Sequence, residues 1–354
     1  MATYKLVDTE QLETDLKTVA DAIREKGGTT DQLAFPDGMA SAVEAIQAGG
    51  GDEPTPPADG KTRIYIHLDE GRTSPMLGVC PNGTVTVDWG DGTTPDTLTG
   101  TSTTYVRFTE NHNYAEAGDY VITLTVDGKM LFKGVSNVGN GAYILRSASS
   151  SDNINVKYSS SVKKVEIGSN VSIGDYAFLY CYGLKSINIP NGITSFGKSA
   201  FEYCVSLQNA PISGNISSIG ESAFENCSGI TSVSLPDGIT SISKDAFHTC
   251  RNLSSVNIPN SVSSIGNYAF YNCSNLANMT MPTGITSIGS SAFYGCYGMR
   301  YYDFSACTSV PTLSNTNAFD GIPADCEILI PAALFDEWGA ATNWTTYASY
   351  MKAV

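Results

Sequence analysis

Cysteines at one fixed spacing are the residues in this chain whose type and arrangement could do chemistry. Six of the nine cysteines recur every 23 residues, at Cys181, Cys204, Cys227, Cys250, Cys273 and Cys296. Stacked units would bring such thiols within disulfide reach, and a ladder of thiolates could bind metal. However, no Cys-x-x-Cys pair and no histidine accompanies these positions. We therefore expect no metal site and buried thiols that pack as small apolar side chains, with a disulfide ladder as the open alternative.

Titratable groups that could converge on a substrate are sparse. His67, His112 and His248 lie far apart in the sequence, with no nucleophile or metal motif beside them. Glu202 and Glu225 occupy equivalent positions one repeat apart, and paired carboxylates can cleave glycans when they face each other across a groove. We expect these two glutamates on an exposed turn without a pocket. The pattern predicts no catalytic residues, with a glycan-cleaving enzyme as the least favoured alternative.

Three aspartates near a Trp-Gly-Asp-Gly turn could supply oxygen ligands to Ca²⁺. They are Asp88, Asp91 and Asp96, and their spacing is not that of an EF-hand loop. Gly-Asp-Gly also fits a tight turn in which an aspartate accepts a backbone hydrogen bond. The tight turn is the favoured interpretation, so we expect no cofactor, and Ca²⁺ is the one that the pattern leaves open.

Tyrosines near the repeating phenylalanines and cysteines are the candidate binding residues. Eight of them stand where other units have polar residues: Tyr176, Tyr180, Tyr182, Tyr203, Tyr268, Tyr271, Tyr294 and Tyr297. Tyrosine combines a large contact area with a polar tip and is favoured at recognition surfaces. The hypothesis is an aromatic ridge that binds a ligand, and the alternative is ordinary tyrosine packing.

A 23-residue repeat must position these side chains. Besides the cysteines, six phenylalanines share the period: Phe178, Phe201, Phe224, Phe247, Phe270 and Phe293. In each unit, Ala-Phe-x-x-Cys predicts a helical turn and Leu-x-x-Val-x-Ile-Pro a strand. One coil cannot close a core but six stacked coils can. We therefore expect repeats over residues 171–331, closed by a C-terminal cap over 332–354.

Residues before the repeat suggest three further parts. Residues 62–132 alternate short β-rich runs with turns, which predicts a small antiparallel β-sandwich, and 133–170 would form the solenoid entry and N-terminal cap. Residues 49–61 are a Gly/Pro linker. Residues 1–48 predict a helical attachment or oligomerisation segment, whose 4-3-4 apolar seam is Leu12, Leu16, Val19 and Ile23. A homotrimer and a helix folded back on its own chain are both open.

Charge and hydropathy exclude two classes of partner. Twenty lysines and arginines against 35 aspartates and glutamates give a formal net charge of −15. This balance repels phosphate backbones and anionic lipid, so we expect no nucleic-acid partner. No stretch approaches the ~18 apolar residues of a membrane span, and the N-terminus lacks a Sec-type leader pattern. We therefore expect no membrane insertion.

The repeat unit, Ile-Thr-Ser-Ile-Gly followed by Ala-Phe-x-x-Cys-x-x-Leu-x-x-Val-x-Ile-Pro, resembles the BspA-like leucine-rich repeats of bacterial surface proteins. Residues 84–93, with Trp89-Gly-Asp-Gly92, followed by His112-Asn-Tyr114 and residues 118–126, are similar to PKD domains, which are immunoglobulin-like spacers or contact modules. Trp89 stands where that family often has Phe, and a preceding Trp strand is missing. Residues 20–39 look like segments that begin tail-associated proteins of phages and prophages.

Together these features predict a multidomain, mainly β protein with a short helical segment, an immunoglobulin-like (PKD-like) sandwich and a leucine-rich-repeat solenoid. The favoured function is a non-enzymatic phage or prophage tail protein that binds a host cell-surface glycan or protein. Its N-terminal segment would contact other virion or tail proteins, and its location would be the virion. The alternative is a BspA-type adhesin, on the bacterial surface or secreted.

Overall fold

The computed structural model describes residues 57–102, 106–134, 144–146 and 158–354. The predicted helical segment, with the seam Leu12, Leu16, Val19 and Ile23, lies outside the described residues, as does most of the predicted linker. Within the part of the chain that is described, no helix is long and apolar enough to cross a membrane.

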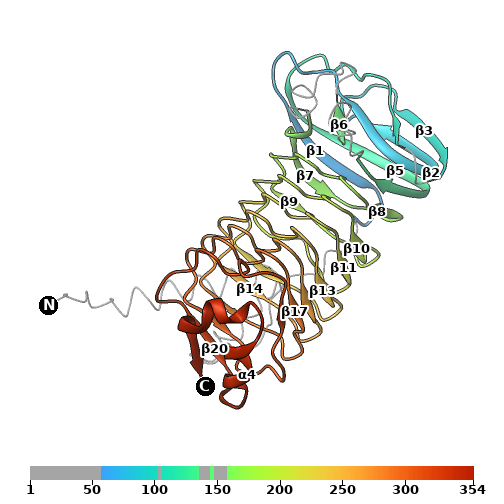
Figure 1. Ribbon diagram of the computed structural model, residues 1–354. Coiled ribbons are helices and arrows are strands. Elements are labelled where there is room, and N and C mark those ends of the chain that lie inside the picture. Colours follow the sequence, from blue (N-terminus) through green and yellow to red (C-terminus); the bar gives the residue numbers. More distant parts are fainter. Residues whose placement is uncertain (1–56, 103–105, 135–143, 147–157) are drawn as a thin grey trace, which may run out of the picture. The chain divides into compact units, whose positions relative to one another are not determined.

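The repeats form a solenoid of successive coils, and most coils contribute a short strand to each of two rows (Figure 1). One row holds β8 (Val171–Ile173), β10 (Ser195–Phe196), β11 (Ser218–Ile219), β13 (Ser241–Ile242), β15 (Ser264–Ile265), β17 (Ser287–Ile288) and β19 (Thr312–Leu313). The other holds β7 (Val162–Glu166), β9 (Ser186–Ile187), β12 (Ser232–Ser234), β14 (Ser255–Asn257), β16 (Asn278–Thr280), β18 (Tyr301–Asp303) and β20 (Glu327–Ile330). Paired strands from consecutive full coils are parallel and one repeat apart in register, as in Ser264↔Ser287. The predicted solenoid is therefore confirmed.

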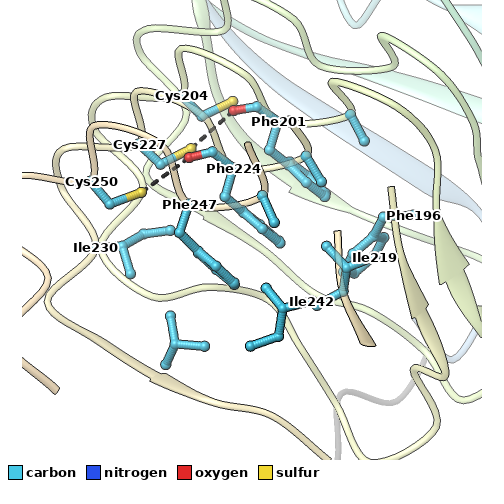
Figure 2. Packing of buried hydrophobic residues seen from close by; sticks show 14 of the residues in the cluster. Phe196, Phe201, Cys204, Ile219, Phe224, Cys227, Ile230, Ile242, Phe247 and Cys250 are labelled. Carbon is cyan, nitrogen blue, oxygen red and sulfur yellow. Dashed lines mark hydrogen bonds between the residues drawn. The ribbon is translucent and has the colours of Figure 1, made fainter. Parts of the chain in front are cut away.

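Apolar side chains at the repeat period fill the interior. The six repeat phenylalanines are completely buried, and neighbouring rings are nearly parallel, with centroids 5.3–5.6 Å apart (Figure 2). Burying one such side chain contributes roughly 1.5–3 kcal/mol. Because each ring packs on rings from the preceding and following coils, the core is continuous along the repeats.

The cysteines of the repeat do more than fill space. The nine cysteines are free and buried. From Cys204 to Cys296, each repeat thiol donates a hydrogen bond to the phenylalanine carbonyl of the preceding coil, over 3.0–3.4 Å (Figure 2). Each of these carbonyls also accepts the N–H of the cysteine in its own coil, as Phe201 does from Cys204 at 3.0 Å, so the thiol is a second donor that alanine could not supply. The expected apolar role is therefore accompanied by a hydrogen-bonding role.

The Ala-Phe-x-x-Cys segment is a turn and not the predicted helical turn. The residues two before and two after each phenylalanine have positive φ, as at Ser199 (52°) and Tyr203 (62°). The N–H groups of Ser199, Phe201 and Tyr203 donate to the carbonyls of Glu221, Ala223 and Glu225 in the next coil. Bonding between coils thus replaces the i to i−4 bonds of a helix, and it extends the parallel pairing around the turn.

An antiparallel β unit precedes the coils. Its strands are β1 (Thr62–Leu68), β2 (Met76–Asp88), β3 (Asp96–Thr101), β4 (Arg107–Phe108) and β5 (Gly118–Phe132), with β6 (Leu145–Arg146) also paired to β2. The predicted strands at 63–68 and 120–126 lie within β1 and β5. The predicted strand at 84–89 overlaps β2 and extends one residue beyond its end. Ile64, Val87, Trp89 and Leu124 are completely buried in this unit.

The β unit covers the first coil directly. β5 pairs in parallel with β8, and β1 pairs antiparallel with β7, so both strand rows continue into the unit. The Phe132 ring lies 5.3 Å from the ring of Phe178 and extends the phenylalanine column. The cap on the N-terminal side of the coils is therefore built by β1 and β5, which sequence analysis assigned to a separate sandwich. Shared backbone hydrogen bonds join the two parts.

The last coil is closed by a short segment after β20. It contains η1 (Ala332–Leu334), α4 (Phe335–Ala340), η2 (Trp344–Tyr350) and β21 (Met351–Ala353), which pairs in parallel with β20. Trp338 and Trp344 are completely buried, and the Trp344 indole donates to the Pro311 carbonyl at 2.6 Å. The Phe319 N–H, which has no further coil to pair with, donates to the Tyr347 hydroxyl at 3.0 Å.

Candidate ligand-binding surface

The eight candidate tyrosines lie on the turn edge, which we define as the surface formed by residues two before to four after each repeat phenylalanine. Six of the eight are half-buried, whereas Tyr268 and Tyr297 are exposed by 37% and 60%. The structure brings six of them into two ring clusters. Tyr176 and Tyr297 have no ring contact with the other described residues and belong to neither cluster.

The C-terminal cluster contains Tyr268, Tyr271 and Tyr294 together with His248. His248, Tyr271 and Tyr294 stack in order, with centroids 4.9 Å apart at each step and interplanar angles of 14° and 7°. Tyr268 meets Tyr271 edge-on at 5.9 Å. Sequence analysis missed His248, although it follows its phenylalanine directly, as Tyr271 and Tyr294 do, and this shared phase was the available signal.

The N-terminal cluster contains Tyr180, Tyr182 and Tyr203. The Tyr180 ring lies 5.0 Å from Tyr203 and 5.9 Å from Tyr182, in tilted arrangements. Tyr182 and Tyr203 are edge-to-face, at 6.2 Å and 70°. The planes of these three rings therefore differ in orientation, whereas the rings of His248, Tyr271 and Tyr294 are nearly parallel.

Two glutamates directly follow their phenylalanines, Glu202 in the coil of Tyr203 and Glu225 in the next coil. Glu225 forms an ion pair with His248 at 3.3 Å. Burial acts to raise the pKa of Glu225, but hydrogen bonds from His248 and Ser222 outweigh it and hold that pKa below its usual value. Burial, with the nearby charge of Glu225, raises the pKa of Glu202 despite a hydrogen bond from Ser199. Equivalent positions thus hold carboxyl groups shifted in opposite directions.

Left-handed backbone positions make some of these tyrosines unusual. Tyr180 and Tyr203 have φ of 59° and 62°, at the position where later coils have Asn226 or Asn272. Asparagine and glycine tolerate this region best, and other residues are strained there by roughly 1–2 kcal/mol. Local backbone preference therefore does not account for tyrosine at these positions.

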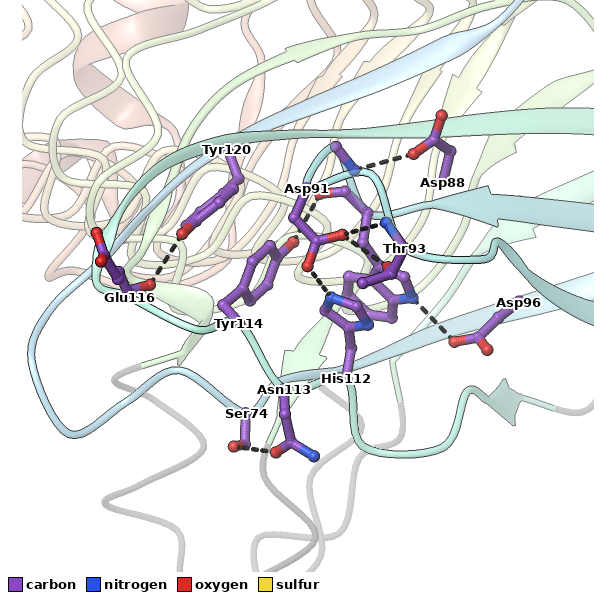
Figure 3. Close-up of polar contacts among 12 residues, drawn as sticks. Ser74, Asp88, Asp91, Thr93, Asp96, His112, Asn113, Tyr114, Glu116 and Tyr120 are labelled. Carbon is purple, nitrogen blue, oxygen red and sulfur yellow. Dashed lines mark hydrogen bonds and ion pairs between the residues drawn. The ribbon is translucent and has the colours of Figure 1, made fainter.

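The three aspartates of the N-terminal unit are engaged in the turn (Figure 3). Asp88 accepts from the Gly90 N–H at 3.0 Å, Asp91 from the Thr93 N–H at 3.2 Å, and Asp96 from the Trp89 indole at 2.9 Å. The first two are the aspartate-backbone bonds of the tight-turn interpretation, and the third is a bond between two side chains. No group of three or more acidic, histidine or cysteine side chains in the described ranges is placed to hold a metal ion.

The same turn also engages His112. Its Nε2 lies 2.7 Å from Asp91, and its ring stacks on Trp89 at 4.5 Å. Burial would raise the pKa of Asp91, but hydrogen bonds from Thr93 and His112 hold it below its usual value. Tyr114 donates to the Trp89 carbonyl at 2.9 Å. These contacts order the turn from within.

The histidines and glutamates do not converge on one site. His67 pairs with Asp119, His112 with Asp91, and His248 with Glu225, so each has a different carboxylate. A hollow of about 340 Å³ lies beside β8 and β10, where Leu131, Gly174, Thr194 and Ser218 are among its lining residues. Neither Glu202 nor Glu225 lines it.

Comparisons with known proteins agree with this architecture. A family model described as the BspA type leucine rich repeat region, in six copies, matches residues 153–259 and 240–331, which is about half of the chain. No functionally curated protein matches. Among solved structures, a leucine rich cell surface protein from Faecalibacterium prausnitzii is 21% identical, with 59% of this chain and 70% of that chain covered and a TM-score of 0.40.

Two other solved structures are similar. A leucine rich repeat protein from T. pallidum is 21% identical, with 55% of this chain and 83% of that chain covered and a TM-score of 0.41. A leucine-rich repeat protein from Bacteroides ovatus is 18% identical, with 58% of this chain and 72% of that chain covered and a TM-score of 0.29. The matched repeats and the stacked coils lead to one conclusion: the chain belongs to the BspA type leucine rich repeat family.

Proposed function

We propose that this protein is a non-enzymatic bacterial cell-surface binding protein of adhesin type, which contacts a glycan or protein through the tyrosines of its turn edge. The observation that carries the proposal is the pair of aromatic clusters on coils whose interior is regular. Among the clustered tyrosines, Tyr180, Tyr203 and Tyr268 occupy left-handed positions, where tyrosine fits less well than asparagine or glycine. Large aromatic side chains with polar tips suit a recognition surface.

Family membership supports the cellular location more than the virion location that sequence analysis favoured. The similar protein from Faecalibacterium prausnitzii is described as a cell surface protein. The phage resemblance rests on residues 20–39, which lie outside the described residues. We therefore place the tail-associated receptor-binding role second.

The remaining parts have supporting roles in this proposal. Residues 62–132 would be a PKD-like unit that both caps and spaces the solenoid, a role supported by the Trp89 turn and by the pairing of β5 with β8. Leu12, Leu16, Val19 and Ile23 would form an attachment or oligomerisation seam. Light scattering on the full chain would distinguish a trimer from a monomer.

Location and binding are tested together. Immunogold labelling with an antibody to the repeats should decorate intact producer cells, and label only on particles released by prophage induction would overturn the cellular proposal.

Purified protein should bind components of a glycan and protein array. The double variant Tyr271→Ser, Tyr294→Ser should lose at least about fivefold in affinity for a target contacted by that cluster. Ser255→Ala on the strand face is the control. The double variant Tyr180→Ser, Tyr203→Ser tests the N-terminal cluster in the same way, and unchanged binding of every target by both double variants would exclude the tyrosines.

A further inference from the structure

The N-terminal cluster combines three aromatic rings with a carboxylate. Tyr182 and Tyr203 lie in consecutive coils, and Glu202 directly precedes Tyr203 in the chain. Burial raises the pKa of Tyr203, and the negative charge of Glu202 raises it further. Glu202 acts in the same direction on Tyr182, after burial and Tyr203. The backbone places Glu202 in this cluster, because the Tyr180 N–H donates to the Glu202 carbonyl at 2.9 Å and Tyr203 is its chain neighbour.

Glu202 differs from the neighbouring Glu221 and Glu225 in its ion pairing. Glu221 pairs with Lys198 at 3.1 Å and with Lys244 at 3.0 Å, and Glu225 pairs with His248. Among the ion pairs of residues 57–354 that the structure describes, none includes Glu202. This side chain is nonetheless half-buried. The charge of Lys198 acts to lower the pKa of Glu202, but burial outweighs it and the pKa is raised, so a ligand that supplied a paired cation would relieve the cost of desolvation.

Aromatic faces near a carboxylate recognise cations by two additive effects. The face of a tyrosine ring attracts a cation through its quadrupole, by roughly 0.5–2 kcal/mol, depending on desolvation. The carboxylate adds a charge-assisted hydrogen bond when the cation carries N–H groups. The formal net charge of −15 also favours the approach of a cationic partner.

We propose that Tyr180, Tyr182, Tyr203 and Glu202 form a site for a primary ammonium group, the lysine side chain of a protein partner. The ring centroids are only 5.0–6.2 Å apart, so the rings touch one another and do not enclose a bulky trimethylammonium group. A compact ammonium can lie over their faces and donate to Glu202. This inference deepens the proposed function by naming the ligand chemistry of one cluster.

Peptide titration tests the site with defined probes. Binding of acetyl-Gly-Lys-Gly-amide to the full chain is followed by NMR chemical-shift changes, alongside the Nε-acetylated peptide and choline chloride. The lysine peptide should bind at least about fivefold more tightly than its neutral acetylated form, because acetylation removes the charge. Equal binding of the two peptides, or tighter binding of choline, would overturn the primary-ammonium assignment.

Matched variants identify the residues involved. Glu202→Gln keeps the side-chain size, removes the charge and should weaken lysine-peptide binding at least about fivefold. Asp237→Asn removes one negative charge from an exposed position and should change the affinity less than about twofold. Tyr203→Asn should weaken binding about two- to fivefold, because one ring face is lost. Equal effects of the Glu202 and Asp237 variants would reduce the site to net charge and contradict the proposal.

The outcomes separate this inference from the proposed function. If lysine does not bind at the N-terminal cluster, cell-surface labelling and target loss in the Tyr271→Ser, Tyr294→Ser variant are unaffected. If labelling is found only on virions, the lysine site is still measured independently on the purified chain. Circular dichroism of each variant shows whether a lost affinity reflects a lost fold.

Discussion

The interior and the turn edge of the same coils differ in how much their residues vary from coil to coil. Inside, each coil repeats Phe and Cys at one phase, and each ring stacks on the next at 5.3–5.6 Å. On the turn edge, the residue directly after phenylalanine changes from Glu202 through Glu225 and His248 to Tyr271. Only the interior positions are confined by neighbours on all sides. The difference suggests that the interior determines stability and that the turn edge is available for binding.

The largest expected effect is in the interior. Phe247→Ala removes a completely buried ring that stacks between Phe224 and Phe270. We expect the free energy of unfolding to fall by about 3–5 kcal/mol, because a cavity opens in a column that cannot close from either side. Urea unfolding followed by circular dichroism measures this. Phe247→Leu is the control and should cost less. A loss below about 1 kcal/mol would mean that the interior is not the stabilising region.

Alkaline pH should lower the free energy of unfolding, because the thiols of the interior ionise more easily in the unfolded chain. Burial raises the pKa of Cys250 and Cys296 from 9.0 to about 12. Because the unfolded thiols ionise first, each contributes a loss of stability that begins near pH 9 and continues to about pH 12, at up to about 1.4 kcal/mol per pH unit. Urea midpoints from pH 7 to 10 measure the slope. The double variant Cys250→Ala, Cys296→Ala should show a shallower slope, and native alkylation of these thiols at pH 9 would contradict their burial.

The smallest effect should come from the turn edge. Tyr203→Asn loses ring contacts that contribute about 0.5–1.5 kcal/mol, but asparagine fits its left-handed backbone better by a similar amount. We expect the free energy of unfolding to change by less than about 1 kcal/mol, measured by the same urea titration. Tyr203→Val is the contrasting variant, because a β-branched residue loses the rings and also resists positive φ. A cost for Tyr203→Asn equal to that of Phe247→Ala would erase the distinction between interior and edge.

Periodicity predicts the solenoid because every coil repeats the same burial pattern. The helical-turn prediction for Ala-Phe-x-x-Cys was wrong, because the N–H of Phe201 bonds to Ala223 in the next coil. A pattern within one unit cannot reveal a hydrogen bond to another. The predicted domain boundary at residues 132/133 separates two parts that the structure joins, because β5 pairs with β8.

The candidate surface was predicted only as a set of residues. Position near the repeating phenylalanines and cysteines grouped eight tyrosines, but it did not separate them into two clusters or exclude Tyr176 and Tyr297 from both. Ring contacts depend on side-chain direction at left-handed positions, which the spacing does not encode. The role of Tyr268 and its partners in binding stays a prediction.

By itself, the sequence determined the coil period, the identity of the buried columns and the acidic surface, because burial and charge follow directly from residue type and spacing. Only the tertiary structure decided which carboxylates have cations. Glu202 and Glu225 are equivalent in the repeat, yet only Glu225 meets His248, at 3.3 Å. An ion pair depends on what the next coil presents within a few ångströms, and stacking of the coils sets that distance.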